Sequence, residues 1–335
     1  MRVSTRAPKT IKRRALLVSS GAWLILAAAP SFTQPSKAPR RIAVLFPGTE
    51  AGSRTNLQVF RAALRELRYV EGRDISIEVR WADGRTERIA SLAAEVVASN
   101  PAVIVTASSE GVAACKRATS SIPIVFATAA FVVEQGFVAS LRRPGGNITG
   151  VVLHGLDAKI VEVIREALPA ARRLAILVNE KDRFHKIALD SFEPAARRFK
   201  FDPVVVRVAR AEDFERAFKE LSDRRVDVLH VPNINLLVSN RGWLAELALK
   251  ARLPLFGTNP DIAMAGGLLS YGTSLEENYR RAAALVDKIL RGAKPGELPV
   301  EQPERFQLIV NMKTAKAIGV TLSPVTMLRA DKVIE

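Results

Sequence analysis

Short runs of apolar and β-branched residues alternate along this chain with longer segments whose apolar residues recur at helical spacing. A strand is expected at residues 41–46, because the unbroken apolar run after Arg41 is typical of a parallel strand that is covered on both faces. Residues 56–68 place Leu57, Phe60 and Leu64 on one helical face. Further strands are expected at residues 75–81, 102–105, 123–126 and 148–152, and further helices at 86–99, 111–118 and 134–141.

The same alternation restarts after residue 152. Helices are expected at residues 160–168, 185–199, 211–221, 243–251 and 275–290, and strands at 174–178, 204–208, 226–231, 255–256, 268–271 and 306–310. This order predicts right-handed βαβ units and parallel sheets. Because two such rounds contain too many strands for one compact sheet, we expect two.

The sequence therefore predicts an α/β protein with two Rossmann-like lobes. Residues 40–152 and 273–335 are assigned to lobe 1, and residues 153–272 to lobe 2. A chain that passes between the lobes several times forms a hinge, with a cleft between the lobes. Since ligands of open α/β sheets bind beyond the carboxyl ends of the strands, the cleft is the expected binding site.

The first 35 residues have the pattern of a secretory signal peptide. Six basic residues and no acidic residue precede Pro35, and an apolar stretch covers residues 15–29. That stretch is short for a membrane span, which needs about 20 residues. The pair Arg13-Arg14 resembles a twin-arginine export signal. We therefore expect export to the periplasm with removal of residues 1–35, and the alternative is an N-terminal membrane anchor.

The positive charge of the chain raises the question of nucleic-acid binding. The 335 residues carry a net charge of +16, and removal of six basic residues with the leader leaves +10 (16 − 6). Basic residues alternate with acidic ones along the expected helices, which is typical of solvated helix faces rather than of a phosphate-binding track. No zinc-finger or RNA-binding motif accompanies them. We expect no nucleic-acid partner.

Catalytic motifs are missing. Residues 47–53 lack the Gly-Lys-Ser/Thr ending of a phosphate-binding loop, and neither a dinucleotide fingerprint nor a Gly-x-Ser-x-Gly elbow occurs. Three scattered histidines have no metal-binding spacing, and Cys115 is expected to be a buried, inert thiol. A single cysteine also excludes a disulfide framework. The sequence thus predicts no enzyme, cofactor or metal, and a hydrolase on the same architecture is the alternative.

Small polar residues follow the expected strands instead. Thr106, Ser108 and Ser109 lie between a buried strand and a helix, where hydroxyls and free backbone N–H groups suit a carboxylate. Simple N-capping by Ser108 or Ser109 explains the same residues.

The second lobe offers a complementary set. Asn179 and Asn233 follow two of its strands, and Asp261 can meet a ligand ammonium group or cap a helix. Phe131 can stack on a flat ligand or belong to the core. The candidate ligand-binding residues are therefore Thr106, Ser108, Ser109, Phe131, Asn179, Asn233, Asp261 and Tyr271.

Several stretches resemble one known family. They are Ser-Ile-Pro-Ile-Val-Phe at residues 121–126, Arg-Pro-Gly-Gly-Asn-Ile-Thr-Gly at 143–150, Ala-Gly-Gly-Leu-Leu-Ser-Tyr-Gly at 265–272, and the tail from 279 to 331. In this order, over nearly the whole chain, they are similar to ABC-transporter substrate-binding proteins of the tryptophan/tyrosine type. The chain departs from the pattern at residues 130–133, Ala-Phe-Val-Val, where many members have Gly-Asp-Pro-Val, and at 179–183.

The resemblance implies a type I periplasmic-binding-protein fold with two lobes and three crossings. It also implies an extracytoplasmic solute receptor, acting as a monomer, which closes on a small polar ligand. Such a receptor delivers the ligand to an ABC permease that works with a separate ATPase. The ligand class that it suggests is an amino acid, aromatic in some members, or a related organic acid. A ligand-binding sensor for a membrane receptor is the alternative function.

Overall fold

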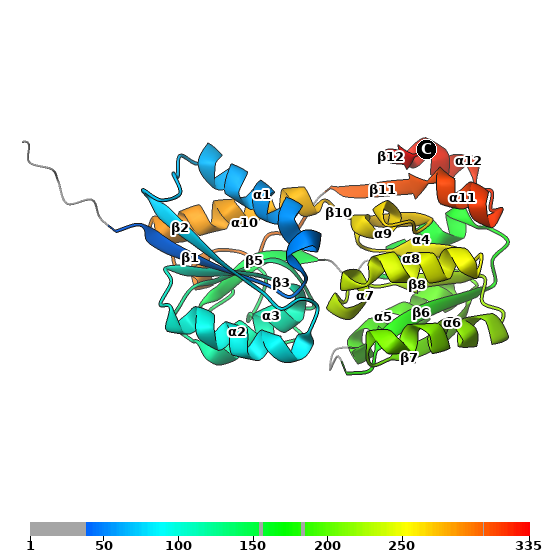
Figure 1. Ribbon diagram of the computed structural model, residues 1–335, viewed down its shortest axis with the longest axis horizontal. Coiled ribbons are helices and arrows are strands. Elements are labelled where there is room, and N and C mark those ends of the chain that lie inside the picture. Colours follow the sequence, from blue (N-terminus) through cyan, green and yellow to red (C-terminus); the bar gives the residue numbers. More distant parts are fainter. Residues whose placement is uncertain (1–37, 154–156, 182–184, 304) are drawn as a thin grey trace, which may run out of the picture. The chain divides into compact units, whose positions relative to one another are not determined.

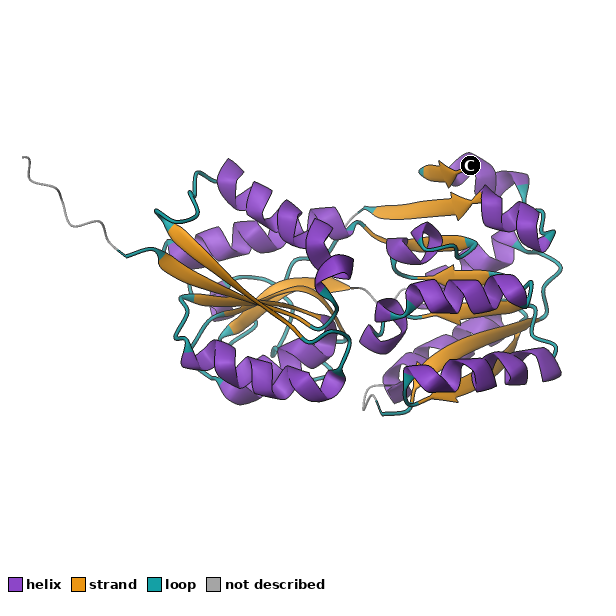
Figure 2. Cartoon of the chain, in the orientation of Figure 1, coloured by secondary structure: helices purple, strands orange, loops and turns teal. Residues whose placement is uncertain are grey.

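The computed structural model describes residues 38–153, 157–181, 185–303 and 305–335. The predicted signal peptide lies outside the described residues, and so does part of the segment at residues 151–156 where the sequence predicts that the chain passes from lobe 1 to lobe 2. Strands and helices alternate along the described chain, and the strands form two sheets, one coloured blue to green and the other green to red in Figure 1. Figure 2 shows the same strands in orange with the helices around them in purple. In the described residues, no helix is both long and apolar enough to cross a bilayer.

The first sheet has five parallel strands in the order β2-β1-β3-β4-β5. These are β1 (Arg40–Phe46), β2 (Ile75–Trp81), β3 (Val103–Ala107), β4 (Ile124–Ala130) and β5 (Ile148–Leu153). Its helices are α1 (Glu50–Glu66), α2 (Thr86–Ala98), α3 (Ser108–Ala118) and α10 (Leu275–Leu290). Alternate residues of β1 face opposite ways, so Val44 packs with α1 and α10 and Leu45 packs with α2 and α3. We call this sheet with its helices lobe 1.

The second sheet has seven strands in the order β12-β11-β10-β9-β8-β6-β7. They are β6 (Arg173–Asn179), β7 (Asp202–Val208), β8 (Val228–Val231), β9 (Leu255–Gly257), β10 (Leu269–Thr273), β11 (Phe306–Asn311) and β12 (Lys332–Ile334). One face packs on α4 (Asp157–Ala167), α5 (His185–Arg198) and α11 (Met312–Ile318), and the other on α6 (Phe214–Asp223), α8 (Arg241–Lys250) and α9 (Pro260–Met264). The shorter elements beside this sheet are α7 (Asn235–Ser239), α12 (Pro324–Arg329) and η1 (Ala211–Asp213), whereas η2 (Pro295–Glu297) contacts β5 of lobe 1. This sheet with its helices is lobe 2.

The predicted α/β class is confirmed, since parallel pairs dominate both sheets, but the assignment of residues 306–335 to lobe 1 is wrong. α10 packs on α1 in lobe 1. β11, by contrast, pairs with β10, with Leu269 opposite Val310, and therefore belongs to the second sheet. This pairing is antiparallel, so the second sheet is mixed rather than purely parallel. The helix predicted at residues 134–141 is also wrong, because turns that include Gly136 at φ +66° fill this segment.

Candidate functional site

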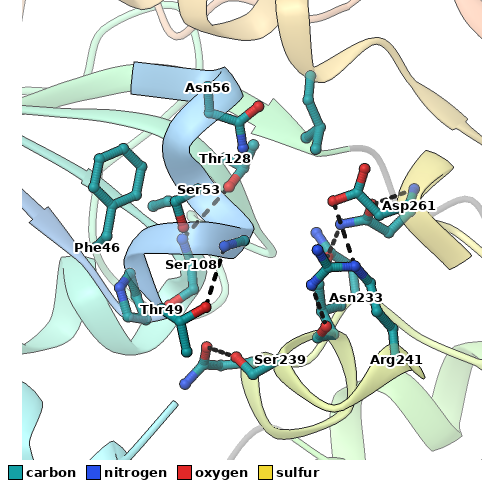
Figure 3. A pocket seen from close by; sticks show the side chains of 18 of the residues that line it. Phe46, Thr49, Ser53, Asn56, Ser108, Thr128, Asn233, Ser239, Arg241 and Asp261 are labelled. Carbon is teal, nitrogen blue, oxygen red and sulfur yellow. Dashed lines mark hydrogen bonds and ion pairs between the residues drawn. The ribbon is translucent and has the colours of Figure 1, made fainter. Parts of the chain in front are cut away.

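A small cavity of about 100 Å³ lies where loops of both lobes meet (Figure 3). Lobe 1 contributes the loop after β1, the first turns of α1 and α3, and two residues of α10. Lobe 2 contributes α7, the start of α8 and the loop from β9 into α9. The lining side chains include Phe46, Thr49, Ser53, Asn56, Ser108, Thr128, Asn233, Asn235, Ser239, Arg241, Asn259, Asp261 and Tyr279.

Two helix N-termini from lobe 1 reach this cavity. Thr49 caps α1, because its hydroxyl accepts a hydrogen bond from the backbone N–H of Gly52 at 3.2 Å. Ser108 opens α3 at φ +65°, and its hydroxyl accepts from the N–H of Gly111 at 3.3 Å. The backbone N–H of Ser108 donates to the hydroxyl of Thr128 at 3.5 Å. N-termini carry partial positive charge and spare N–H groups, so this wall suits a carboxylate.

The wall from lobe 2 is held by an amide chain. The side chain of Asn259 caps α9 by accepting from the backbone N–H of Asp261 at 2.9 Å, and its Nδ2 donates to Oδ1 of Asn233 at 3.2 Å. Asn235 accepts from the hydroxyl of Ser239 through Oδ1, while its buried Nδ2 has no partner among the described residues. Because a buried amide nitrogen without an acceptor is costly, Asn235 is suited to donate to a ligand oxygen.

Asp261 and Arg241 are the charged residues of the lining, and they are of opposite sign. Their side chains approach to 3.8 Å, which is an ion pair without a close hydrogen bond (Figure 3). Burial raises the pKa of the Asp261 carboxyl, and the nearby Arg241 guanidinium opposes that rise. A partly buried carboxylate gains from a second cation, so Asp261 suits a ligand ammonium group.

An aromatic cluster forms one side of the cavity. Phe46 stacks on Trp81 with ring centroids 4.6 Å apart, and Tyr279 lies 6.0 Å from Phe46. Burial and the charge of Asp261 raise the pKa of the Tyr279 hydroxyl, so this ring is neutral and lies near the carboxylate of the other lobe. The cavity thus combines separate positive, negative and aromatic regions.

Of the eight residues predicted from the sequence, Ser108, Asn233 and Asp261 line this cavity. Asn179 lines a neighbouring cavity of about 800 Å³, which shares Thr49 and Ser239 with the first.

The other four predicted residues are engaged in the fold. Thr106 is buried and donates to the carbonyl of Leu45 at 3.0 Å, and Ser109 accepts from the side-chain amide of Gln135 at 3.2 Å. Tyr271 stacks on Phe306, with centroids 5.7 Å apart. Phe131, at φ +52°, lines neither of these two cavities.

Sequence reasoning missed Thr49, Arg241 and the aromatic cluster. Thr49 lies in the loop after the first strand and caps the next helix, so the rule that predicted Ser108 after the third strand also identifies it. Tyr279 and Arg241 lie within helices, so no strand end marks them.

The sequence profile of the ABC transporter substrate binding protein family matches residues 41–334. The chain belongs to this family. The predicted family is therefore confirmed, and members act outside the cytoplasm as solute-binding components of ABC transporters rather than as enzymes.

Similar proteins support the same fold. A tyrosine-binding protein of Clostridioides difficile (strain R20291) is 27% identical over 259 residues, which is 77% of this chain and 75% of that protein. The ABC domain in complex with L-Trp from Streptococcus pneumoniae is 20% identical with a TM-score of 0.83, covering 89% of this chain and 100% of that one. The ligand-free, open structure of a Clostridium difficile substrate-binding protein is 22% identical with a TM-score of 0.66, covering 88% and 99%. Such likenesses confirm the type I periplasmic-binding-protein fold.

Proposed function

We propose that the protein is the receptor of an ABC importer for a free α-amino acid, with an aromatic side chain favoured. The observation that carries this proposal is the opposition of two capped helix N-termini, at Thr49 and Ser108, to the carboxylate of Asp261. Such a pair of walls complements a zwitterion, whose carboxylate and ammonium are joined by one carbon atom. Phe46 and Tyr279 supply an apolar, aromatic surface for the side chain. The names of the tyrosine-binding relative and of the L-Trp complex agree with this ligand class.

Membership of the family and the two-lobed site support a transport role. We infer that the lobes close on the ligand and that the closed form delivers it, as a monomer, to a permease with a separate ATPase. To shift the protein from a closed-to-open ratio of 1:99 to one of 99:1, the ligand must bind the closed form about 5.5 kcal/mol more tightly than the open form. Charge pairing on both walls and burial of an aromatic side chain can supply this difference. We also infer that the receptor acts in the periplasm after removal of residues 1–35.

The ligand class is tested by titration calorimetry and thermal shift with L-tryptophan, L-tyrosine and L-phenylalanine. Two fragments serve as controls: indole-3-propionic acid lacks the ammonium group, and tryptamine lacks the carboxylate. We expect saturable binding of an intact amino acid and at least a tenfold loss, about 1.4 kcal/mol, with either fragment. Equal binding of the fragments, or no binding of any amino acid, would refute the proposal.

Matched variants connect this result to the site. Asp261→Asn removes the charge for the ammonium group, and Asp190→Asn, on the outer face of α5 beside Lys186, is its control. Ser108→Ala removes a capping hydroxyl that lines the cavity. Ser323→Ala is the control: the Ser323 hydroxyl caps α12 by accepting from the backbone N–H of Thr326, and Ser323 does not line the cavity. We expect both Ser variants to lose similar stability, but only Ser108→Ala to lose affinity.

A further inference from the structure

Three helices of lobe 2 end in the same way, and each is followed by a basic residue in a left-handed backbone conformation. Lys200, Arg225 and Arg252 follow α5, α6 and α8 and adopt left-handed backbones with φ of +61°, +51° and +51°. In each case the next residue donates its N–H to a carbonyl five residues back: Phe201 to Ala196, Val226 to Leu221, and Leu253 to Ala248, at 2.9, 3.0 and 2.9 Å. These bonds define Schellman caps.

Glycine is the residue that adopts this backbone with least strain. The same chain uses glycine after α10 and α11, where Gly292 and Gly319 have φ of +103° and +73°. The cap geometry therefore does not require a basic side chain. At these three positions in lobe 2, glycine would form the same cap with less backbone strain, so the basic side chains add charge that the cap does not need.

Sheet topology brings these residues to one edge. Each helix leads into a parallel strand, and β6, β7, β8 and β9 start side by side, with Arg173 opposite Asp202 and Leu229 opposite Leu255. Neighbouring strands lie about 4.8 Å apart, so the starts of these four strands form a row roughly 15 Å long. Six exposed cations near these strand starts form no ion pair among the described residues, and we call them the basic edge: Arg172, Arg198, Lys200, Arg225, Lys250 and Arg252. Arg173 and Arg224 are also exposed here, but they pair with Asp202 and Glu220.

Nearby carboxylates leave most of the charge of the basic edge uncompensated. Asp202 pairs with Arg173 at 3.8 Å, Asp223 pairs with Lys219 at 2.7 Å, and Asp227 accepts from the backbone of the loop before β6. Across the described parts of the chain, none of the six cations of the basic edge has a carboxylate partner within 4.0 Å. Their charge is therefore available to an external anion.

A surface cavity and an exposed leucine add to the basic edge. The cavity, of about 680 Å³, is lined by Arg165, Arg172, Arg198 and Lys200 with four neutral residues and no carboxylate. Leu249 precedes Lys250 at the end of α8 and is 45% exposed. Cations beside an exposed apolar side chain are typical of surfaces that lie on a lipid bilayer.

We propose that the basic edge binds the phosphate groups of an anionic lipid bilayer and holds the receptor at the membrane surface. The ligand cavity lies at the opposite ends of the same strands, because Asn233 and Asn259 follow β8 and β9. Membrane attachment thus leaves the cavity free. The proposal does not depend on the identity of the ligand.

The test is co-sedimentation of the purified protein with phosphatidylglycerol-rich vesicles and with phosphatidylcholine vesicles. The variant is the triple substitution Lys200→Gly, Arg225→Gly, Arg252→Gly. The control is Arg68→Gly, Arg142→Gln, Arg143→Gln, which removes three exposed charges from lobe 1 and includes the left-handed Arg68, at φ +72°. Since each basic residue near an anionic leaflet contributes about fivefold, we expect roughly 100-fold weaker partitioning for the variant alone. Its melting temperature is expected not to fall, because glycine fits these caps.

Several results overturn the proposal. They are equal losses in the variant and the control, equal binding to both kinds of vesicle, and wild-type binding that salt does not weaken. Displacement from vesicles by inorganic phosphate alone, at concentrations that leave bilayers intact, would assign the cavity to free phosphate instead. Tighter binding to duplex DNA than to the vesicles, with the same loss in the variant, would assign the basic edge to nucleic acid.

Discussion

A single methyl group at Gly84 tests whether the contact between the lobes controls ligand binding. Gly84 follows β2 in lobe 1 with φ +74°, and a Cβ atom added there lies 3.2 Å from Cβ of Ser239 at the end of α7 in lobe 2. Carbon atoms pack best at about 3.5–4.0 Å. Gly84→Ala therefore introduces both backbone strain and an overlap with the opposite lobe.

Gly136→Ala separates these two effects. Gly136, also in lobe 1, has φ +66°, and an added Cβ meets nothing within 4 Å. Both alanines carry a similar backbone cost of about 1 kcal/mol. The overlap with Ser239 costs about 1 kcal/mol more unless the lobes move apart by a few tenths of an ångström. Under the proposed closure of the lobes on the ligand, the ligand-free lobes separate, so we expect similar melting temperatures for the two variants. We expect about fivefold weaker binding of L-tryptophan for Gly84→Ala alone.

Calorimetric titration of both variants measures this difference. Adding Ser239→Gly to Gly84→Ala removes the overlapping atom, and a double-mutant cycle gives the coupling between the two positions. Equal affinities of Gly84→Ala and Gly136→Ala, or a coupling of zero, would show that the contact does not influence binding.

Three further predictions concern titratable groups. Burial lowers the pKa of His230 to about 4, so on acidification the unfolded chain takes up a proton on this residue before the folded protein does. The contribution of neutral His230 to the free energy of unfolding is complete above about pH 6.5 and falls by roughly 3 kcal/mol towards pH 4. Urea titrations at several pH values should show that His230→Phe loses this pH dependence. Burial raises the pKa of Cys115 to about 12, so a thiol reagent should label it only as fast as the protein unfolds, and rapid labelling of the native protein would contradict the packing. Arg241→Met removes the cation that opposes the rise in the pKa of Asp261, so the carboxylate of the variant takes up its proton at a higher pH. When amino-acid affinity is measured at decreasing pH, the variant should therefore lose affinity at a higher pH than the wild type does.

The local pattern of apolar and polar residues predicted most of the helices and strands. What it missed depends on contacts between residues far apart in the sequence. The buried apolar runs are strands because both faces of each sheet are covered by helices. β11 has the same apolar pattern that a strand of either sheet would have, and only its contact with β10, from Leu269 to Val310, decides the choice. The segment around Phe137 is apolar because it packs in the core, and its turns are set by contacts with the loop before β5 rather than by helical spacing.

The strand-end rule predicted part of the site. Ser108, Asn233 and Asp261 follow β3, β8 and β9 and reach the cavity. Thr106 is still within β3, so its hydroxyl bonds to the neighbouring strand. Tyr271 is also within a strand, where its ring meets a cross-strand neighbour. Helical residues such as Arg241 carry no such positional signal, because their orientation depends on how the helix packs.

The return of the last strands to the second sheet has a consequence for the order of events on the ribosome. Lobe 1 lacks its helix α10 until residue 290 has been made, and the second sheet lacks β11 and β12 until residue 334. Lobe 1 can close its core only after residue 290 and lobe 2 only at the end of synthesis, and the closing contacts join residues far apart in the sequence, which slows folding. The nascent polypeptide therefore exposes parts of both cores until residue 290 has been made, and the core of lobe 2 closes last.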